Sequence, residues 1–205
     1  MNNELKLFID NFTPKEKEAL KFASKVHEGT YRKGTIKEEY IWHPIRVAYL
    51  VNKYKTSKAK EDLICAALLH DTIEDTITDK NDMYHDIVDF FGIQTASLVK
   101  ELTTVDDFKD AVGKTKYLGI KLNDMSSYAL VIKLCDRLDN VSDLDNVSTE
   151  FKEKYLNETI HVLYMLLTKR NEKYISSTHL IIIQDILKKV LSYGEKSFIK
   201  QKTIN

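Results

Sequence analysis

Residues that interrupt helices are scarce in this sequence. Of 205 residues, two are proline and six are glycine. Alternation of polar and apolar residues with a period of two does not run over a useful length, apart from short ambiguous stretches such as residues 180–183. Strands and tight turns depend on these signals, so their scarcity argues against a β-sheet protein. We therefore predict an all-α fold, a bundle of about eight to ten helices.

Cysteine and long apolar runs are also lacking. Cys65 and Cys135 are the two cysteines, and each lies inside an apolar run. This pattern predicts reduced, buried thiols and argues against a disulfide framework. No segment approaches the roughly 18 apolar residues of a membrane span, and residues 1–8 contain no signal-peptide core. We expect a soluble cytoplasmic protein without a membrane partner.

The chain carries no surplus of charge of either sign. Its 31 lysines and arginines balance its 31 acidic residues. No global field therefore attracts nucleic acid, and an anionic ligand must meet positive charge locally. The length suits a single domain over residues 1–205, with a core at about 14–170 and a C-terminal helix at about 179–192. The pattern leaves the oligomeric state open.

Helix signals, in contrast, are frequent. Thr13 is followed by Pro14 and Glu16, which predicts a capped helix over about 14–28 that ends at Gly29. A further break is expected at Gly92, and the stretch 103–112 reads as polar and irregular. The other predicted helices begin at Pro44, Ser57, Thr78, Lys114, Ser126 and Ser148 and at about residue 179.

The densest group of polar residues follows the apolar run 63–69. His70 and Asp71 end that run, and Glu74 and Asp75 stand three and four residues later. Imidazole and carboxylate together suit Mn²⁺ or Fe²⁺, and a ligand set without cysteine argues against a structural zinc site. Neighbouring helical residues point about 100° apart, so His70 and Asp71 share an ion most easily near a helix end.

Two remote segments offer matching donors. His43 precedes a proline, and Asp136 lies within the apolar run 131–135, where a carboxylate needs a cation or metal. Each has a simpler explanation, since His43 could enter a helix and Asp136 could pair with Arg137. The conjunction with His70 and Asp71 makes a mononuclear metal phosphohydrolase the leading hypothesis.

These segments carry a family resemblance. Residues 43–48, 66–76 and 132–140 resemble the three signatures of the HD-superfamily (p)ppGpp hydrolase domain of the RelA/SpoT type. The resemblance covers about residues 18–165 and is nearest to the stand-alone small alarmone hydrolases, known in animals as Mesh1. Residues 23–34 resemble the first-helix end and basic loop of that family.

The resemblance implies a role for each matching position. One Mn²⁺ would be held by His43, His70, Asp71 and Asp136. Glu74 and Asp75 would orient and deprotonate the attacking water or assist the leaving group. Arg32 and Lys33 would contact the guanine base and phosphates, and Asn140 the ribose and phosphate region. The implied reaction removes pyrophosphate from the 3′ position of guanosine tetra- or pentaphosphate.

Several departures from the family leave the substrate open. The loop 32–43 is longer than usual and lacks the family proline, and the segment 103–125 differs most. Asp139 stands where histidine is common, and we expect this extra carboxylate to weaken polyphosphate binding. Extra cations could come from Lys114, Lys116 or Lys121, although a solvated helix face explains them more simply.

Two other functions stay in view. One is an HD phosphohydrolase for another nucleotide or for the 2′-phosphate of NADPH. The other is a non-catalytic nucleotide-binding regulator, against which the intact pair of Glu74 and Asp75 argues.

Overall fold

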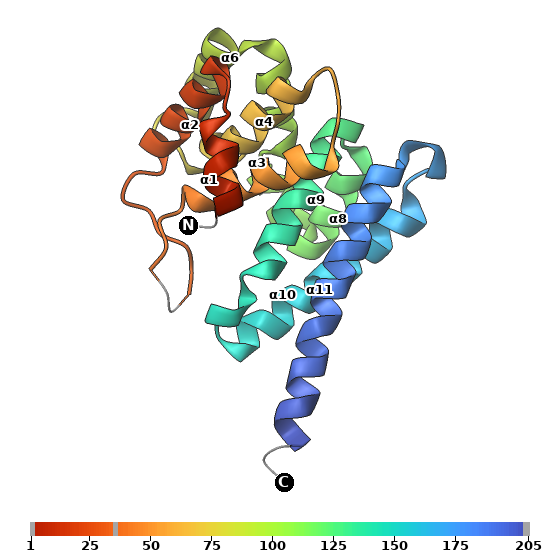
Figure 1. Cartoon of the computed structure of the whole chain (residues 1–205). Helices are drawn as coiled ribbons and strands as arrows, with labels where there is room; N and C mark the ends of the chain where they lie inside the picture. Colours follow the sequence, from red (N-terminus) through yellow and green to blue (C-terminus); the bar gives the residue numbers. More distant parts are fainter. Residues whose placement is uncertain (1–2, 35–36, 203–205) are drawn as a thin grey trace.

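The computed structural model describes residues 3–34 and 37–202, with side chains as far as Gly194 (Figure 1). It is helical throughout, which confirms the predicted all-α fold. Outside the helices, the pairing of extended backbone in the described part consists of one bridge between Tyr31 and Glu39. In chain order, the helices are α1 (Asn3–Asp10), α2 (Pro14–Val26), α3 (Trp42–Tyr54), α4 (Lys60–Leu69), α5 (Thr72–Asp75), α6 (Lys80–Leu102), α7 (Asp106–Val112), α8 (Lys114–Asp124), α9 (Ser127–Ser142), α10 (Thr149–Lys169) and α11 (Ser177–Lys202), with 3₁₀ turns η1 (Leu144–Asn146) and η2 (Glu172–Tyr174).

Two helices form the centre of the molecule. Every residue of α4 from Leu63 to Leu69 is buried, as expected of a helix that is apolar on all sides. It packs against α2, α3 and α6, while α9 packs against α3 and α11. The last turn of α4 and the middle of α9 are therefore held deep in the bundle, and they carry the chemically interesting residues.

Several predicted helix boundaries are confirmed. Thr13 and Glu16 form the reciprocal capping box at the start of α2. The hydroxyls of Ser126 and Ser148 accept hydrogen bonds from the backbone at the starts of α9 and α10. Gly92, at φ 81°, breaks α6 at the predicted place, because glycine adopts this left-handed conformation without a steric cost. Both cysteines are free and buried, as predicted.

Other boundaries differ from the prediction. The stretch 103–112 contains α7, which begins with two aspartates that favour a helix N-terminus and ends at Gly113. Asp79, and not Thr78, caps α6, since its carboxylate accepts from two backbone N–H groups. α4 begins three residues after Ser57, and α11 extends to Lys202.

α1 was not predicted. Its eight residues include none that are fully buried, although Leu5, Phe8 and Ile9 rest against the core. Such a short helix depends on packing against its neighbours, which local propensity does not reveal.

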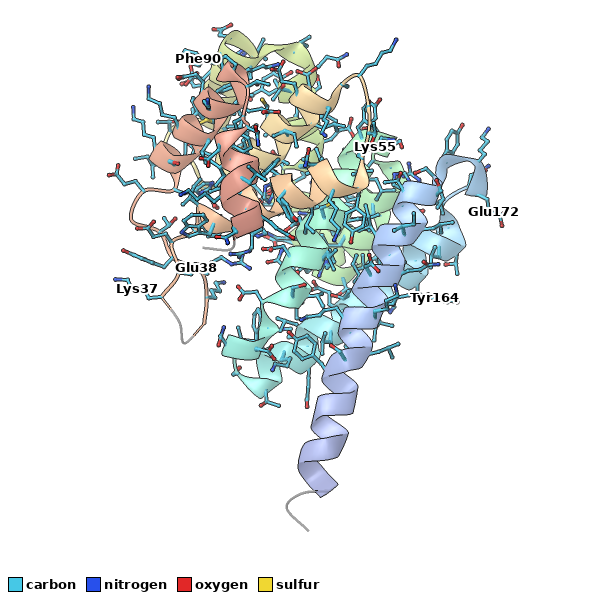
Figure 2. All side chains as sticks on the ribbon, in the orientation of Figure 1. Lys37, Glu38, Lys55, Phe90, Tyr164 and Glu172 are labelled. Carbon is cyan, nitrogen blue, oxygen red and sulfur yellow. The ribbon has the colours of Figure 1, made fainter. Side chains whose placement is uncertain are left out.

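The C-terminal helices form the other side of the molecule. α10 packs on α8, and the far end of α11 extends beyond the rest of the bundle (Figure 1). Tyr164 lies on the outer side of α10, with 64% of its surface exposed (Figure 2). Arg170 follows α10 and donates hydrogen bonds to three backbone carbonyls around the α8–α9 turn. In the described part of the chain, no helix has the length and apolarity needed to span a membrane.

Candidate functional site

Four predicted donors meet where α3, α4 and α9 converge. His43 lies in the first turn of α3, His70 and Asp71 follow the end of α4, and Asp136 lies on α9. His70 Nε2 is 3.0 Å from Asp71 Oδ2, and His43 Nε2 is 3.2 Å from Asp136 Oδ1. His43 Nε2 is also 3.8 Å from Asp71 Oδ2, and His70 Nε2 is 4.0 Å from Asp136 Oδ1. The ligand atoms of His43, His70 and Asp71 all lie within 4.8 Å of one another, a spacing that suits a single ion, and Asp136 lies beside this group.

In both histidines, the nitrogen that faces away from the donor cluster, Nδ1, is hydrogen-bonded to another group of the protein. His70 Nδ1 lies 2.9 Å from the carbonyl oxygen of Ala67, which accepts a hydrogen bond, so Nδ1 carries the hydrogen. Nε2 then presents its lone pair to the centre, where it is buried and makes no hydrogen bond to the described atoms. His43 Nδ1 lies 2.7 Å from Asp139 Oδ2. This orientation is typical of metal-ligating histidines, so the donors fit a divalent ion.

Positive charge and hydroxyl groups support the two aspartates. The Lys133 ammonium is 2.8 Å from Asp136 Oδ2, and the Tyr40 hydroxyl donates to Asp71 Oδ2 at 2.6 Å. Burial alone would raise the pKa of Asp136, but Lys133 and His43 hold it well below its usual range. The carboxylates stay ionised, as metal ligands must.

The centre attracts positive charge. Although burial alone would lower the pKa of His43, its hydrogen bonds with Asp136 and Asp139 raise it to about 9. The carboxylates around this imidazole therefore favour a positive charge at this point. A divalent ion meets the same demand.

Glu74 and Asp75 lie on α5, directly after the donors. Glu74 Oε1 accepts a hydrogen bond from the backbone N–H of Thr104 at 2.5 Å, which fixes its orientation. Asp75 Oδ2 is 3.5 Å from His27 Nδ1. Burial, together with the negative charges of Asp71 and Glu74, raises the pKa of Asp75 to about 6. One acid is thus fixed by the backbone, and burial and neighbouring carboxylates raise the pKa of the other toward neutrality.

Arg32, Lys33 and Asn140 come together at one cavity of about 240 Å³. We call it the basic pocket; its remaining walls are aromatic, apolar or acidic and consist of Tyr31, Tyr40, Asp143, Leu144, Val147, Phe151 and Tyr155. Arg32 donates to Asn140 Oδ1 at 2.8 Å, and the Asn140 amide donates to Asp136 Oδ1 at 2.5 Å. Asn140 therefore connects the basic pocket with the donor cluster. Residues 35 and 36 of the predicted basic loop lie outside the described residues.

Asp139 and Lys121, two charged residues that the sequence left as possible influences on the ligand, are both engaged by the protein itself. Asp139 does not add negative charge to the basic pocket, because its carboxylate binds His43 and Arg46, with Arg46 Nε 2.7 Å from Oδ1. Lys121 is not available to a ligand either, since its ammonium donates to the carbonyls of Leu102 and Thr103. Lys114 pairs with Glu158 at 3.1 Å, and Lys116 is exposed.

The sequence interpretation missed four supporting residues. Lys133 lies one turn before Asp136 and Arg46 one turn after His43, so helical spacing places both on the ligand-bearing faces. Asp139 follows Asp136 at the same interval. Tyr40 had no comparable signal, because it reaches Asp71 from an irregular loop.

The fold and the donors define an all-helical protein with a histidine–aspartate centre suited to a divalent metal ion. The chain belongs to the HD domain family, whose model matches residues 19–172. It is 34% identical over 134 residues to the guanosine-3′,5′-bis(diphosphate) 3′-pyrophosphohydrolase MESH1 of Xenopus tropicalis, covering 65% of this chain and 71% of that protein.

Longer bacterial proteins and a solved structure are similar as well. A GTP pyrophosphokinase of Myxococcus xanthus is 31% identical over 156 residues, which are 71% of this chain but 19% of that protein. This chain thus spans about a fifth of the first bacterial relatives it matches. A solved metazoan orthologue of SpoT, described as hydrolysing ppGpp, superposes with a TM-score of 0.69 at 25% identity, covering 87% of this chain and 96% of that one.

Proposed function

We propose that this protein is a 3′-pyrophosphohydrolase that converts guanosine 3′,5′-bis(diphosphate) and its pentaphosphate analogue into GDP or GTP and pyrophosphate. The observation that carries the proposal is the link through Asn140, which bonds both to the donor aspartate Asp136 and to Arg32 of the basic pocket. A phosphate bound beside Arg32 would lie next to the donor cluster of His43, His70, Asp71 and Asp136, which we call the metal centre. The names of the similar proteins favour the same substrate.

The proposed cofactor is one Mn²⁺ held by His43, His70, Asp71 and Asp136. When bound, such an ion lowers the pKa of a coordinated water and neutralises charge on a phosphate oxygen. The mixed nitrogen and oxygen donors support manganese or iron more than a structural zinc ion. Lys133 and Tyr40 hold the two aspartates in their ligating orientation.

Glu74 and Asp75 divide the proton transfers in this proposal. Glu74, fixed by the Thr104 N–H, orients the attacking water and accepts its proton. Asp75, whose pKa is about 6, is close enough to neutrality to pass a proton on to the leaving oxygen. His27 stays neutral beside Asp75, because burial lowers its pKa to about 4.

The basic pocket would bind the nucleotide. Arg32 and Lys33 supply the cations for its phosphates and approach the base, and Asn140 contacts the ribose and phosphate region. The rings of Tyr31, Phe151 and Tyr155 line the same cavity and offer stacking surfaces for a purine. A small nucleotide of this kind is a cytoplasmic substrate, and no nucleic acid or membrane partner is proposed.

The test is hydrolysis with separate detection of the two products. Purified protein with Mn²⁺ is offered guanosine tetraphosphate, NADPH and a panel of nucleoside phosphates, and pyrophosphate and orthophosphate are measured independently. We expect pyrophosphate from guanosine tetraphosphate. Orthophosphate alone, for example from NADPH, would contradict the proposed reaction and favour the other phosphohydrolase. Tight nucleotide binding without turnover would favour a regulator.

A further inference from the structure

A second cavity lies behind the metal centre, between α1, α3, α9 and α11. Its volume is about 580 Å³, which falls within the range of small-molecule sites. We call it the rear cavity; its lining residues are Leu5, Arg46, Tyr49, Leu50, Tyr54, Leu138, Asp139, Ser142, Asp185, Lys188, Lys189 and Ser192. It shares none of them with the basic pocket. The rear cavity is therefore a separate place for a ligand.

Its walls combine apolar surface with the Lys189 ammonium, which lies 5.5 Å from the centre of the Tyr193 ring. Leucines of α3 and α9 and two tyrosines of α3 supply the apolar part. Both acids of the cavity are already engaged, Asp185 by Tyr54 at 2.7 Å and Lys188 at 2.9 Å, and Asp139 by Arg46 and His43. Lys189 has no carboxylate partner among the described residues.

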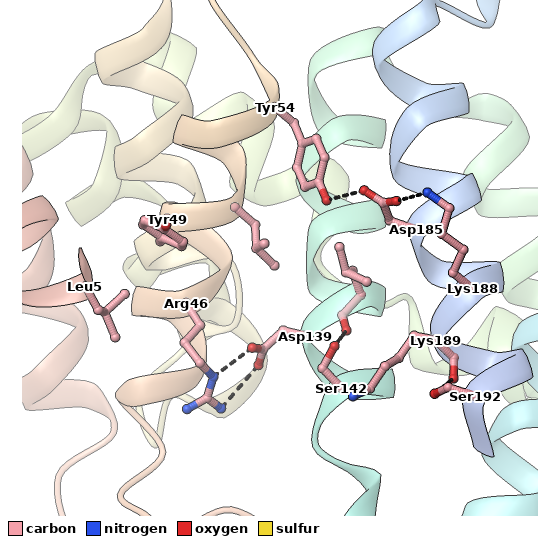
Figure 3. A pocket seen from close by; sticks show the side chains of 12 residues that line it. Leu5, Arg46, Tyr49, Tyr54, Asp139, Ser142, Asp185, Lys188, Lys189 and Ser192 are labelled. Carbon is pink, nitrogen blue, oxygen red and sulfur yellow. Dashed lines mark hydrogen bonds and ion pairs between the residues drawn. The ribbon is translucent and has the colours of Figure 1, made fainter. Parts of the chain in front are cut away.

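We propose that the rear cavity binds a small organic anion with a flat apolar body. The apolar body would lie between the tyrosines and Leu138, and the anionic group would face Lys189. Figure 3 shows Lys189 and Ser192 of α11 on one side of the cavity, and Arg46 of α3 facing Asp139 of α9. A ligand that lacks either the negative charge or the apolar surface would match only part of this lining.

A ligand in the rear cavity also acts on the metal centre. Asp139 binds His43 Nδ1 through Oδ2 and Arg46 through Oδ1 and Oδ2. Arg46 Nη1 is also bound by Glu38 through two hydrogen bonds of 2.9 Å, so an anion in the cavity competes with both acids for this guanidinium. Where it weakens the pair of Arg46 and Asp139, more negative charge stays on Asp139, which makes His43 a stronger ligand. The effect is reciprocal, so metal and anion must strengthen each other's binding by the same factor. This coupling rests on the metal site proposed above; anion binding itself does not.

Naphthalene-1-sulfonate is a suitable probe, because it has a flat apolar body and carries one negative charge on a sulfonate group, which a phosphohydrolase does not cleave. Calorimetry of the metal-free protein should show one site, which uncharged 1-naphthalenemethanol fills less tightly. Lys189→Gln should weaken sulfonate binding at least about 5-fold. Ser142→Tyr, at an exposed position on the cavity wall, should abolish binding by filling the space. The matched control Lys58→Gln, on an exposed loop outside the cavity, should change nothing.

Two results would overturn the site. One is equal sulfonate affinity in the wild-type, Lys189→Gln and Ser142→Tyr proteins. The other is displacement of the sulfonate by guanosine tetraphosphate without metal, which would place it in the basic pocket. For the coupling, Mn²⁺ affinity is measured with and without saturating sulfonate, and we expect it to tighten at least about 2-fold. Unchanged or weaker Mn²⁺ binding contradicts the coupling, whereas failure to hydrolyse guanosine tetraphosphate affects only the proposed reaction.

Discussion

The metal centre and the basic pocket adjoin each other but are built differently. His43 and His70 are each 1% exposed, and each has its outer nitrogen bound to another protein group. In the basic pocket, Lys33 is exposed, and Arg32 is held by longer contacts of 3.4 Å to Asp143 and one bond to Asn140. The centre is a closed network of buried groups, whereas the pocket is lined partly by exposed groups with fewer or longer contacts.

This difference predicts that substitutions in the two regions have effects of different size. A buried donor that loses its partner leaves an unsatisfied polar group, which costs far more than the bond itself contributed. A half-exposed cation that loses its partner is solvated again, so substitutions there have small effects. Changes at Arg32 and Lys33 are therefore expected to alter the choice of substrate more than the rate of the reaction.

The largest effect is expected when a donor is removed. Asp71→Ala should abolish Mn²⁺ binding and lower kcat/KM by at least about 10³-fold, because the ion supplies several kcal/mol of transition-state stabilisation. Metal content by elemental analysis and turnover are measured on the same sample. An active, metal-free variant would overturn the ligand assignment.

Removing the proposed base should separate metal binding from turnover. Glu74→Gln keeps the hydrogen bond from Thr104 but cannot accept a proton, so we expect normal Mn²⁺ content and a kcat lower by at least about 10²-fold. Exposed Glu28→Gln is the matched control. Loss of metal from Glu74→Gln would instead place Glu74 among the ligands.

The free energy of unfolding should depend on pH through the buried His27. The pKa of this buried imidazole is about 4, below its value of about 6.5 in the unfolded chain. The unfolded state therefore takes up a proton first as the pH falls, and stability present above pH 6.5 is lost toward pH 4, by up to about 3 kcal/mol. Urea unfolding of metal-free wild-type and His27→Gln proteins measures the difference. Parallel stability profiles would contradict it.

Removing the charge of Asp139, which is hydrogen-bonded to the proposed ligand His43, should have a smaller effect than removing a ligand itself. Asp139→Asn keeps the shape but removes the charge beside His43, so we expect Mn²⁺ affinity to fall about 10-fold. Exposed Asp86→Asn on α6 is the control. An unchanged Mn²⁺ affinity would show that Asp139 serves Arg46 alone.

The smallest effect is expected in the basic pocket. Arg32→Gln should raise KM about 5- to 10-fold with little change in kcat, because one charge-assisted contact to a phosphate is lost. Exposed Lys25→Gln is the control. A drop in kcat as large as that of Glu74→Gln would erase the distinction between the two regions.

Some residues of the site could be predicted from the sequence, and others could not. The convergence of the four candidate donors could be predicted from the sequence, because two are adjacent and Asp136 is an acid in an apolar run that needs a partner. Their supports were harder to predict: Arg46 and Asp139 come from different helices, and only packing brings them together. In the fold, caps such as Thr13 and Ser126 could be predicted from local bonds. α1 could not, because its stability comes from the neighbours it covers.

The spacing of the four candidate donors along the chain would also link metal binding to stability. They come from three segments far apart in the sequence, and α4 and α9 must be packed before those segments meet. An unfolded chain has no such cluster, so an ion would bind the finished fold and lock it by mass action. A bound ion would therefore raise the free energy of unfolding of the whole bundle, and the three segments would separate less readily in its presence.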